Sequence, residues 1–292
     1  MKKDFLKEEV IHGVDGYAYA QYHITNLLYP FYISYHWHNE IEVIYIKKGM
    51  LKVIIDDTEY MGNEGDVFLV NPGQIHMMST KDLTTEYYTL LFDIKLIEFE
   101  QKDEVNDYFK AINEEELRLI TCIRQHVSYE KIRRYIEEII SMNIMKNKLY
   151  KFDTKVKILQ ILRLLLGNSY MLAEDRRYEG KNKEIKRLIL TYIEENYNSR
   201  ITLTDVANIA HMSEKYFSRF FKENFGINFI DYITRVRLEK AAILLRTTDN
   251  SVTDIALKCG YTNISYFIRS FKKSFEVSPH KFRTTKREIF ED

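Results

Sequence analysis

The chain is poor in cysteine and has no long apolar run. Its two cysteines, Cys122 and Cys259, are far apart and in no metal-binding spacing, which argues against a disulfide scaffold and fits small core residues in a reducing compartment. The opening "MKKDFLKEEVIHG" lacks the apolar segment of a secretory signal. The most apolar helical stretch, "VKILQILRLLL", is interrupted by Gln160 and Arg163 and is too short to span a bilayer. We therefore expect a cytoplasmic protein with no membrane partner.

The chain also has no net charge. Over 292 residues, 43 Lys and Arg balance 43 Asp and Glu. The balance is uneven, because residues 1–180 carry a net charge of −6 and residues 181–292 carry +6. Such a split favours contact between the basic half and a polyanion, although a basic half is also often just a solvated surface. With 45% hydrophobic and 29% charged residues, the chain should be globular, and its length allows two domains.

The chain divides into a strand-rich beginning and a helical remainder. Short runs rich in Tyr, Ile, Val and Thr between Gly, Asn and Asp turns fill residues 1–100 and favour a closed barrel or a sandwich. Apolar residues three and four apart predict helices over residues 101–170, including one across "NEEELRLITCIRQHV". Residues 171–182 are polar and aperiodic, which indicates a linker, and residues 183–292 are helical in pattern. We predict an α+β, two-domain fold: a β-barrel followed by helices, then an all-α domain.

An internal repeat occupies the C-terminal part. "TLTDVANIAHMSEKYFSRFFKENFGIN" aligns with "SVTDIALKCGYTNISYFIRSFKKSFEVS", with one inserted residue in the second copy. Each copy begins with a hydroxyl residue three positions before an aspartate, at Thr202 and Ser251, a variant of the capping box that starts a helix. Tight turns at His211 and Gly260 lead to a second helix, which makes each copy a helix-turn-helix.

The second helix of each copy has one apolar and one polar face. Phe217, Phe221, Phe267 and Phe271 fall on one side, where each copy's Tyr-Phe pair should belong to the core. The opposite side carries hydrogen-bond donors that can reach into a major groove. A polar face that is only exposed to solvent would explain the pattern in one such hairpin equally well. It does not explain why both copies of the repeat carry the same polar face at matching positions. The predicted DNA-binding residues are Lys215, Ser218, Arg219, Lys222, Asn263, Ser265, Ile268, Arg269 and Lys272.

On these motifs, residues 183–283 resemble the DNA-binding domain of the AraC/XylS family of transcription regulators. "NFIDYITRVRLEKAAILLRTT" would be the helix that joins its two subdomains, and "YTNISYFIRSFKKSFEVSPHKFR" is similar to its closing signature. The departures are the missing glycine in the first turn and Glu276 in place of a common glycine. The resemblance implies double-stranded DNA as partner, two adjacent major-groove contacts, and more often activation than repression. It also implies that residues 101–170 form a homodimer, with packing against their own domain as the alternative.

A second motif lies near the N-terminus. "HWHNEIEVIYIKKG" is similar to the first cupin motif, and "GDVFLVNPGQIH" approximates the second. In a strand, His36 and His38 would share one face and Trp37 the other. With Glu42 and His76 they could bind Mn, Fe, Ni or Zn. A polar network that shapes a metal-free pocket is the other interpretation.

The family resemblance favours the metal-free pocket. Barrels with an "HWH" stretch in AraC-type regulators usually sense a small ligand without a required metal, so the resemblance implies effector-binding roles for His36, His38, Glu42 and His76. It implies no catalytic residue and no cofactor, with a metal at these four residues as the alternative. Thr80 replaces the asparagine of the second cupin motif, and Pro30 the glycine before the first. Histidine, Glu, Tyr and Trp inside a barrel are compatible with a sugar, and also with aromatic acids or peptides.

Three functions are therefore compared. The first is a transcription regulator controlled by a small-molecule effector. The second is a cupin metalloenzyme, an isomerase or oxygenase, with a helical appendage. The third is a constitutive DNA-binding protein whose barrel serves only for dimerisation. The tandem helix-turn-helix separates them, and it favours the regulator.

Overall fold

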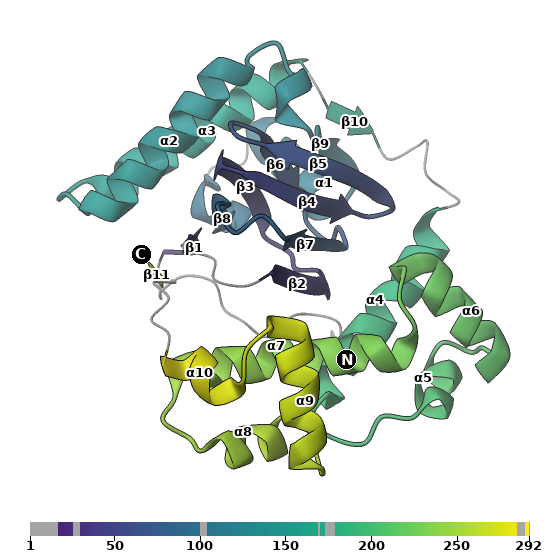
Figure 1. Cartoon of the computed structure of the whole chain (residues 1–292). Coiled ribbons are helices and arrows are strands. Elements are labelled where there is room, and N and C mark those ends of the chain that lie inside the picture. The colour runs from purple at the N-terminus through teal and green to yellow at the C-terminus, as the bar shows by residue number, and fades with distance from the viewer. Residues whose placement is uncertain are drawn as a thin grey trace.

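The computed structural model describes residues 17–25, 30–99, 104–168, 170–172, 179–284 and 290–291, and it consists of a strand-rich upper part and a helical lower part (Figure 1). The strands are β1 (Tyr19–Ile24), β2 (Phe31–His36), β3 (Ile41–Lys48), β4 (Met50–Ile55), β5 (Thr58–Asn63), β6 (Val67–Val70), β7 (His76–Thr80), β8 (Glu86–Phe92), β9 (Leu117–Leu119), β10 (Tyr170–Leu172) and β11 (Phe290–Glu291). The α+β, two-domain prediction is confirmed.

Two antiparallel sheets make up the core of the upper part. One has the strand order β11-β1-β8-β3-β6 and the other the order β2-β7-β4-β5, while β9 and β10 form a separate pair. A cluster of buried apolar side chains from both larger sheets, including Ile44, Val53 and Met78, fills the space between them. The described strands thus form a two-sheet sandwich of the kind compatible with a cupin-like fold, without closing into one continuous barrel.

Two long helices cover the outer face of the five-stranded sheet. The helices of the upper part are η1 (Ile94–Leu96), α1 (Glu104–Asn113), η2 (Ile123–Gln125), α2 (Tyr129–Met145) and α3 (Tyr150–Asn168). Ile136 and Ile139 of α2 and Leu162 and Leu165 of α3 are buried in one cluster with side chains of the sheet, such as Leu90. One face of the α2–α3 pair therefore packs against its own domain. This arrangement was the alternative to a dimer interface in the sequence analysis.

The helix predicted across residues 113–127 is wrong. This segment contains β9 and η2. Leu117 and Leu119 alternate with Arg118, and both leucines join the core. The side chain of Asn71 accepts a hydrogen bond from the Leu119 N–H at 2.8 Å and donates one to its carbonyl oxygen at 3.0 Å. Because these bonds satisfy an extended backbone, the short strand is favoured over a helical turn.

The lower part consists of helices alone among its described residues. They are α4 (Glu179–Asn196), α5 (Leu203–Ile209), α6 (Glu214–Phe225), α7 (Phe229–Thr247), α8 (Val252–Lys258), α9 (Ile264–Phe275) and α10 (Pro279–Thr284). Helix α4 begins inside the segment predicted as a linker, of which residues 173–178 lie outside the described residues. In the part of the chain that the structure describes, no helix is long and apolar enough to cross a membrane.

The repeat predicted from the sequence forms two helix-turn-helix units, α5–α6 and α8–α9, which α7 joins. Thr202 and Asp205 make the complete capping box of α5. His211 and Gly260 have positive φ values of 54° and 79°, as the two turns require. A side chain at Gly260 would also meet the Tyr197 carbonyl oxygen at 2.8 Å. The phenylalanines assigned to the core are buried in two separate clusters, one for each unit.

Candidate effector site and nucleic-acid interface

The four residues of the cupin-like motifs converge between the two sheets. His36 ends β2 and faces His76, its register partner at the start of β7. Glu42 lies on β3 in the other sheet, and His38 lies in the connection from β2 to β3. The prediction that His36 and His38 share one strand is thus wrong, yet their candidate ligand atoms and those of Glu42 and His76 all lie within 4.8 Å of one another.

Main-chain oxygens orient all three imidazoles in the same way. Each Nδ1–H donates to a carbonyl oxygen two residues away, at 2.9 Å from His36 to Ser34, 3.2 Å from His38 to Glu40 and 3.0 Å from His76 to Gln74. Because a carbonyl oxygen can only accept, Nδ1 is the donor in each of these bonds. The Nε2 atoms of His38 and His76 lie 3.4 Å and 2.9 Å from Glu42 Oε2.

Burial and mutual charge decide how these groups titrate. His38, Glu42 and His76 are 2%, 3% and 0% exposed. Burial, together with the neighbouring imidazoles, holds the pKa of His36 well below its usual range. Burial opposes the charged form of Glu42, but His38 and His76 outweigh it and lower the pKa of this carboxyl. The site thus combines a Glu42 side chain that favours its charged form with a His36 imidazole that resists protonation.

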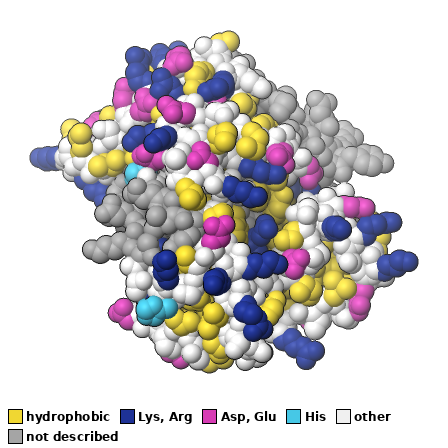
Figure 2. Space-filling model, in the orientation of Figure 1, with side chains coloured by type: hydrophobic (Ala, Val, Ile, Leu, Met, Phe, Trp, Pro, Cys, Tyr) yellow, Lys and Arg dark blue, Asp and Glu magenta, His cyan; other side chains and the backbone are white. Residues whose placement is uncertain are grey.

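All nine predicted DNA-binding residues are solvent-exposed on α6 and α9 or at the start of α9. The Arg219 guanidinium lies 5.4 Å from the centre of the Tyr216 ring, and its Nε lies 3.8 Å from the Glu223 carboxylate. Asn263 has a second use, because its side-chain oxygen caps α9 by accepting the Tyr266 N–H at 2.9 Å. In Figure 2, Lys and Arg side chains spread over the lower half of the face shown, where the helical part lies.

The two tyrosines of the repeat correct the sequence prediction. Tyr216 and Tyr266 are 48% and 47% exposed at matching positions of α6 and α9. They had been expected to belong to the core with the phenylalanine that follows each. Their 50-residue offset, the same as that of Arg219 and Arg269, was the signal that could have placed them on the outer face.

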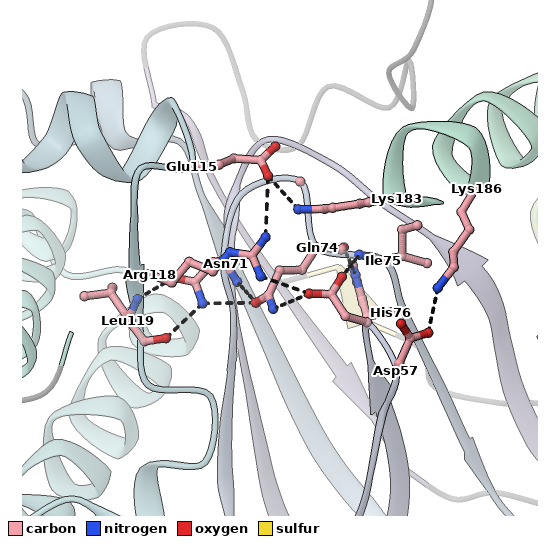
Figure 3. Close-up of polar contacts among 12 residues, drawn as sticks. Asp57, Asn71, Gln74, Ile75, His76, Glu115, Arg118, Leu119, Lys183 and Lys186 are labelled. Carbon is pink, nitrogen blue, oxygen red and sulfur yellow. Dashed lines mark hydrogen bonds and ion pairs between the residues drawn. The ribbon is translucent and has the colours of Figure 1, made fainter. Parts of the chain in front are cut away.

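Cationic side chains of α4 form ion pairs with the strand-rich part. The sequence analysis did not predict these contacts. Lys183 Nζ lies 2.5 Å from Glu115 Oε2, and Lys186 Nζ lies 2.6 Å from Asp57 Oδ1 (Figure 3). Arg187 reaches Glu115 at 2.6 Å. Its guanidinium also lies 4.8 Å from the centre of the Trp37 ring. Trp37 thus packs at the boundary between the two parts, against the buried cluster of the first helix-turn-helix unit.

Strand β2 makes a second set of contacts, with α7. Ser34 N–H donates to Glu239 Oε1 at 2.6 Å, and the Tyr232 hydroxyl donates to the carbonyl oxygen of Tyr35 at 2.9 Å. Burial raises the pKa of Tyr32 above its usual range, and the nearby Glu239 carboxyl raises it further. Because β2 ends at His36, the four-residue cluster and the helical part share a structural element.

Comparison with known proteins agrees with this architecture. Residues 20–136 match the family model for an AraC-like ligand binding domain, and residues 206–285 match that for a helix-turn-helix domain. The chain is 25% identical to the uncharacterized HTH-type transcriptional regulator YdeC of Bacillus subtilis over 86% of each chain. It is 26% identical to YisR of the same organism over 83% of this chain and 85% of that protein. A third relative is the Staphylococcus aureus regulator SACOL0084, to which this chain is 22% identical. That match takes in 87% of this chain but only 33% of SACOL0084.

Among solved structures, ToxT from Vibrio cholerae aligns over 91% of this chain and 97% of its own, with a TM-score of 0.49 and 14% identity. The C-terminal domain of the response regulator yesN from Fusobacterium nucleatum is 40% identical over 34% of this chain and 98% of that domain, with a TM-score of 0.33. The two matched sequence models together take in most of the strand-rich part and both helix-turn-helix units. The chain belongs to the AraC family of DNA-binding transcription regulators, with a ligand-binding domain ahead of its helix-turn-helix domain.

Proposed function

We propose that this regulator reads two adjacent major-groove segments with α6 and α9, and that an effector bound at His36, His38, Glu42 and His76 controls it. The observation that carries the proposal is the pairing of two helices that present the same exposed face. We further propose a homodimer that activates transcription, with the sign of regulation taken from the family resemblance alone.

The paired faces have the chemistry that DNA recognition needs. Arg219 and Arg269 occupy equivalent exposed positions, each two residues after a buried phenylalanine. Arginine can donate two hydrogen bonds to guanine O6 and N7, and such a pair contributes about 1–3 kcal/mol of discrimination between bases. Lys222 and Lys272 stand three residues further along each helix, where phosphate contact would add affinity without sequence preference.

The effector site is proposed at the cluster because it is both buried and connected to the DNA-binding helices. One nitrogen of each imidazole and one carboxylate oxygen lie within 4.8 Å of one another, which brings the polar groups of the four residues together in one place. We propose binding there, without catalysis. The contacts of β2 with α7 and of Arg187 with Trp37 offer a direct path from the cluster to the DNA-binding domain.

A homodimer is proposed through the far end of the α2–α3 hairpin. One group of apolar side chains there is exposed although most of the hairpin is packed on the sheet, with Met145 and Phe152 75% and 64% exposed. The exposed set comprises Ile144, Met145, Leu149, Phe152 and Val156. A second copy is the occupant that fits, because a two-fold dimer would place two DNA-binding domains on one duplex.

The experiment is a fluorescence titration of labelled duplex DNA with the full chain at several salt concentrations. Log affinity should fall with log salt at a slope of about −0.9 for each phosphate contacted. Lys222→Ala and Lys272→Ala should each reduce that slope by about 1, whereas Lys81→Ala, an exposed lysine of the strand-rich part, should leave it unchanged. A slope that all three variants share with the parent chain would contradict the proposed face.

A further inference from the structure

Strand β2 is an edge strand of the four-stranded sheet, and its free side faces α7 (Figure 1). Its pairing with β7 shifts register between Ile33 and His36. The Ser34 N–H lies within this irregular stretch and donates to Glu239 Oε1 of α7 at 2.6 Å. Because the outer side of an edge strand is available to another element, β2 docks on α7 through its backbone as well as through its side chains.

Two tyrosines of β2 contact the ends of α6 and α9, the helices proposed to read DNA. The Tyr35 ring meets the ring of Phe225, the last residue of α6, edge to face, with centroids 5.3 Å apart. The Tyr32 ring stacks on that of Phe275, the last residue of α9, with centroids 6.3 Å apart. Both separations are typical of favourable aromatic pairs. The two phenylalanines are equivalent residues of the repeat, 50 positions apart, so one strand reaches the same place in both units.

The two phenylalanines belong to separate cores. Phe225 is buried in the cluster of the first unit, with its ring centroid 4.5 Å from that of Phe221. Phe275 is buried in the cluster of the second unit, also 4.5 Å from Phe271. Helix α7 contributes side chains to both clusters and joins the units along the chain. Movement of either unit on α7 would change the distance between α6 and α9, and a strand that contacts both units opposes it.

The same tyrosines are fixed to α7 between the two units. The Tyr32 hydroxyl donates to the Arg235 carbonyl oxygen at 3.3 Å and lies 3.5 Å from the Ser274 hydroxyl of α9. The Arg235 guanidinium lies 4.8 Å from the centre of the Tyr32 ring, where the ring attracts a cation. The Tyr232 hydroxyl donates to the Tyr35 carbonyl oxygen at 2.9 Å. Strand β2 therefore contacts α6, α7 and α9 together.

We propose that β2 is a clamp that sets the distance and angle between α6 and α9, with Tyr32 and Tyr35 as its positioning residues. The inference rests on the proposed function, since it assumes that the two helices read adjacent segments of one duplex. The tyrosines need not touch DNA, because each acts through the phenylalanine that it contacts. His36 follows Tyr35 directly, so a change at the effector cluster would reach the clamp.

A clamp predicts a preference for one spacing of the two DNA segments. One inserted base pair moves the second segment by about 3.4 Å along the duplex and turns it by about a tenth of a helical turn. Helices held at a fixed separation then lose the base contacts of one segment. A bidentate contact between arginine and guanine supplies at least about fivefold discrimination. We therefore expect the parent chain to prefer the correct spacing by at least about fivefold over spacings changed by one base pair.

The test measures binding of the full chain to three duplexes. The first is an operator selected from random DNA, and the others have one base pair added or removed between its two segments. The segments are located beforehand as the base pairs at which Arg219→Ala and Arg269→Ala lose preference. Tyr32→Ala and Tyr35→Ala should each reduce the preference for the correct spacing to about twofold or less. Circular dichroism checks folding, and a variant that is unfolded is replaced by leucine at the same position, with the same expectation.

Two controls separate positioning from general stability. Tyr35→Phe keeps the ring that meets Phe225 and should keep the parental spacing preference. Tyr108→Ala, which removes a tyrosine of α1 that is 41% exposed, should keep it too. The clamp is overturned if the parent chain binds all three duplexes equally, or if the variants at Tyr32 and Tyr35 lose the same affinity for each duplex.

The arginine variants show separately whether the proposed function holds. If Arg219→Ala and Arg269→Ala lose no base preference, the two helices do not read adjacent segments, and the proposed function fails together with the clamp. If they lose preference at two separate base pairs while the variants at Tyr32 and Tyr35 keep the parental spacing preference, only the clamp fails.

Discussion

Arg187 of α4 donates its Nε–H to the carbonyl oxygen of Gly73 at 2.9 Å, in the loop that leads to His76. The Gly73 N–H binds the His38 carbonyl oxygen. One glycine thus joins the first helix of the DNA-binding part to the connection that carries His38. Its φ of +69° and the closeness of the Arg187 guanidinium leave no room for a side chain there.

Loss of Arg187 should loosen the contact between the two parts. Arg187→Ala removes the buried hydrogen bonds to Gly73 and one of the three cations at Glu115, and should cost about 1–3 kcal/mol of stability. Amide hydrogen exchange should become faster at Gly73 and Ile75. Arg200→Ala, which removes an exposed arginine of the same part, should have no such effect. Equal exchange in both variants would contradict a stabilising role for this contact.

Gly73→Ala tests the same contact from the other side. The new methyl group would meet the Arg187 guanidinium and the Glu115 carboxylate, and the backbone would be strained. We expect a loss of stability that is smaller in the Arg187→Ala background, because the clash with the guanidinium is then absent. Additive losses in the double variant, measured by urea unfolding, would show that the two residues do not interact.

The pH dependence of stability should reveal Glu239. Burial raises the pKa of this carboxyl from 4.5 to about 8, although the Ser34 N–H opposes the rise. The folded chain therefore holds a proton that the unfolded chain releases, and this stabilisation is complete below pH 4.5. It is lost as pH rises toward 8, at up to about 1.4 kcal/mol per pH unit. The charged or titratable groups that affect or face this carboxyl are Tyr32, Tyr232, Arg235 and Lys240.

Glu239→Gln keeps the shape of the side chain and removes the titration. Unfolding free energies of the variant, measured between pH 5 and pH 8, should fall less steeply than those of the parent chain. The parent and variant curves should diverge as pH rises, with the variant the more stable at the alkaline end. Parallel curves would mean that Glu239 is ionised in the folded chain throughout this range.

The exposed end of the α2–α3 hairpin predicts the oligomeric state. Burial of one large apolar side chain contributes roughly 1.5–3 kcal/mol. Phe152→Glu and Met145→Glu should therefore each weaken self-association by at least about tenfold, as measured by analytical ultracentrifugation. Leu83→Glu changes an exposed leucine elsewhere in the strand-rich part and serves as the control. If the parent chain is monomeric, or if the hairpin variants associate as the control does, the proposed interface is wrong.

The helical half was predictable because its signals are local. Caps at Thr202 and Ser213, the turn at His211 and the spacing of buried phenylalanines all act within a few residues. The repeat then doubled every signal. The exposed tyrosines were missed because Tyr216 is amphipathic and lies beside Phe217, so periodicity alone did not assign it to either face.

The candidate effector site was predictable in its members but not in its geometry. The motifs brought together His36 and His76, which pair across β2 and β7. The role of the main-chain oxygens depends on where strands end, which sequence patterns do not fix. The contacts of Lys186 and Asp57 were invisible for the same reason, since 129 residues separate them. Long-range ion pairs leave no periodic signal.

The proposal that α6 and α9 read adjacent major-groove segments is tested most directly by binding experiments on the full chain. An operator is first selected from random duplex DNA, and binding is then measured to a library of its single-base variants. Arg219→Ala should lose preference at one base pair, and Arg269→Ala should lose preference at another about one helical turn away, roughly 10 base pairs along the duplex. Each should cost about 1–3 kcal/mol for the preferred base. If each variant instead loses the same affinity for every operator, or if both change the same base pair, the two helices do not read adjacent major-groove segments.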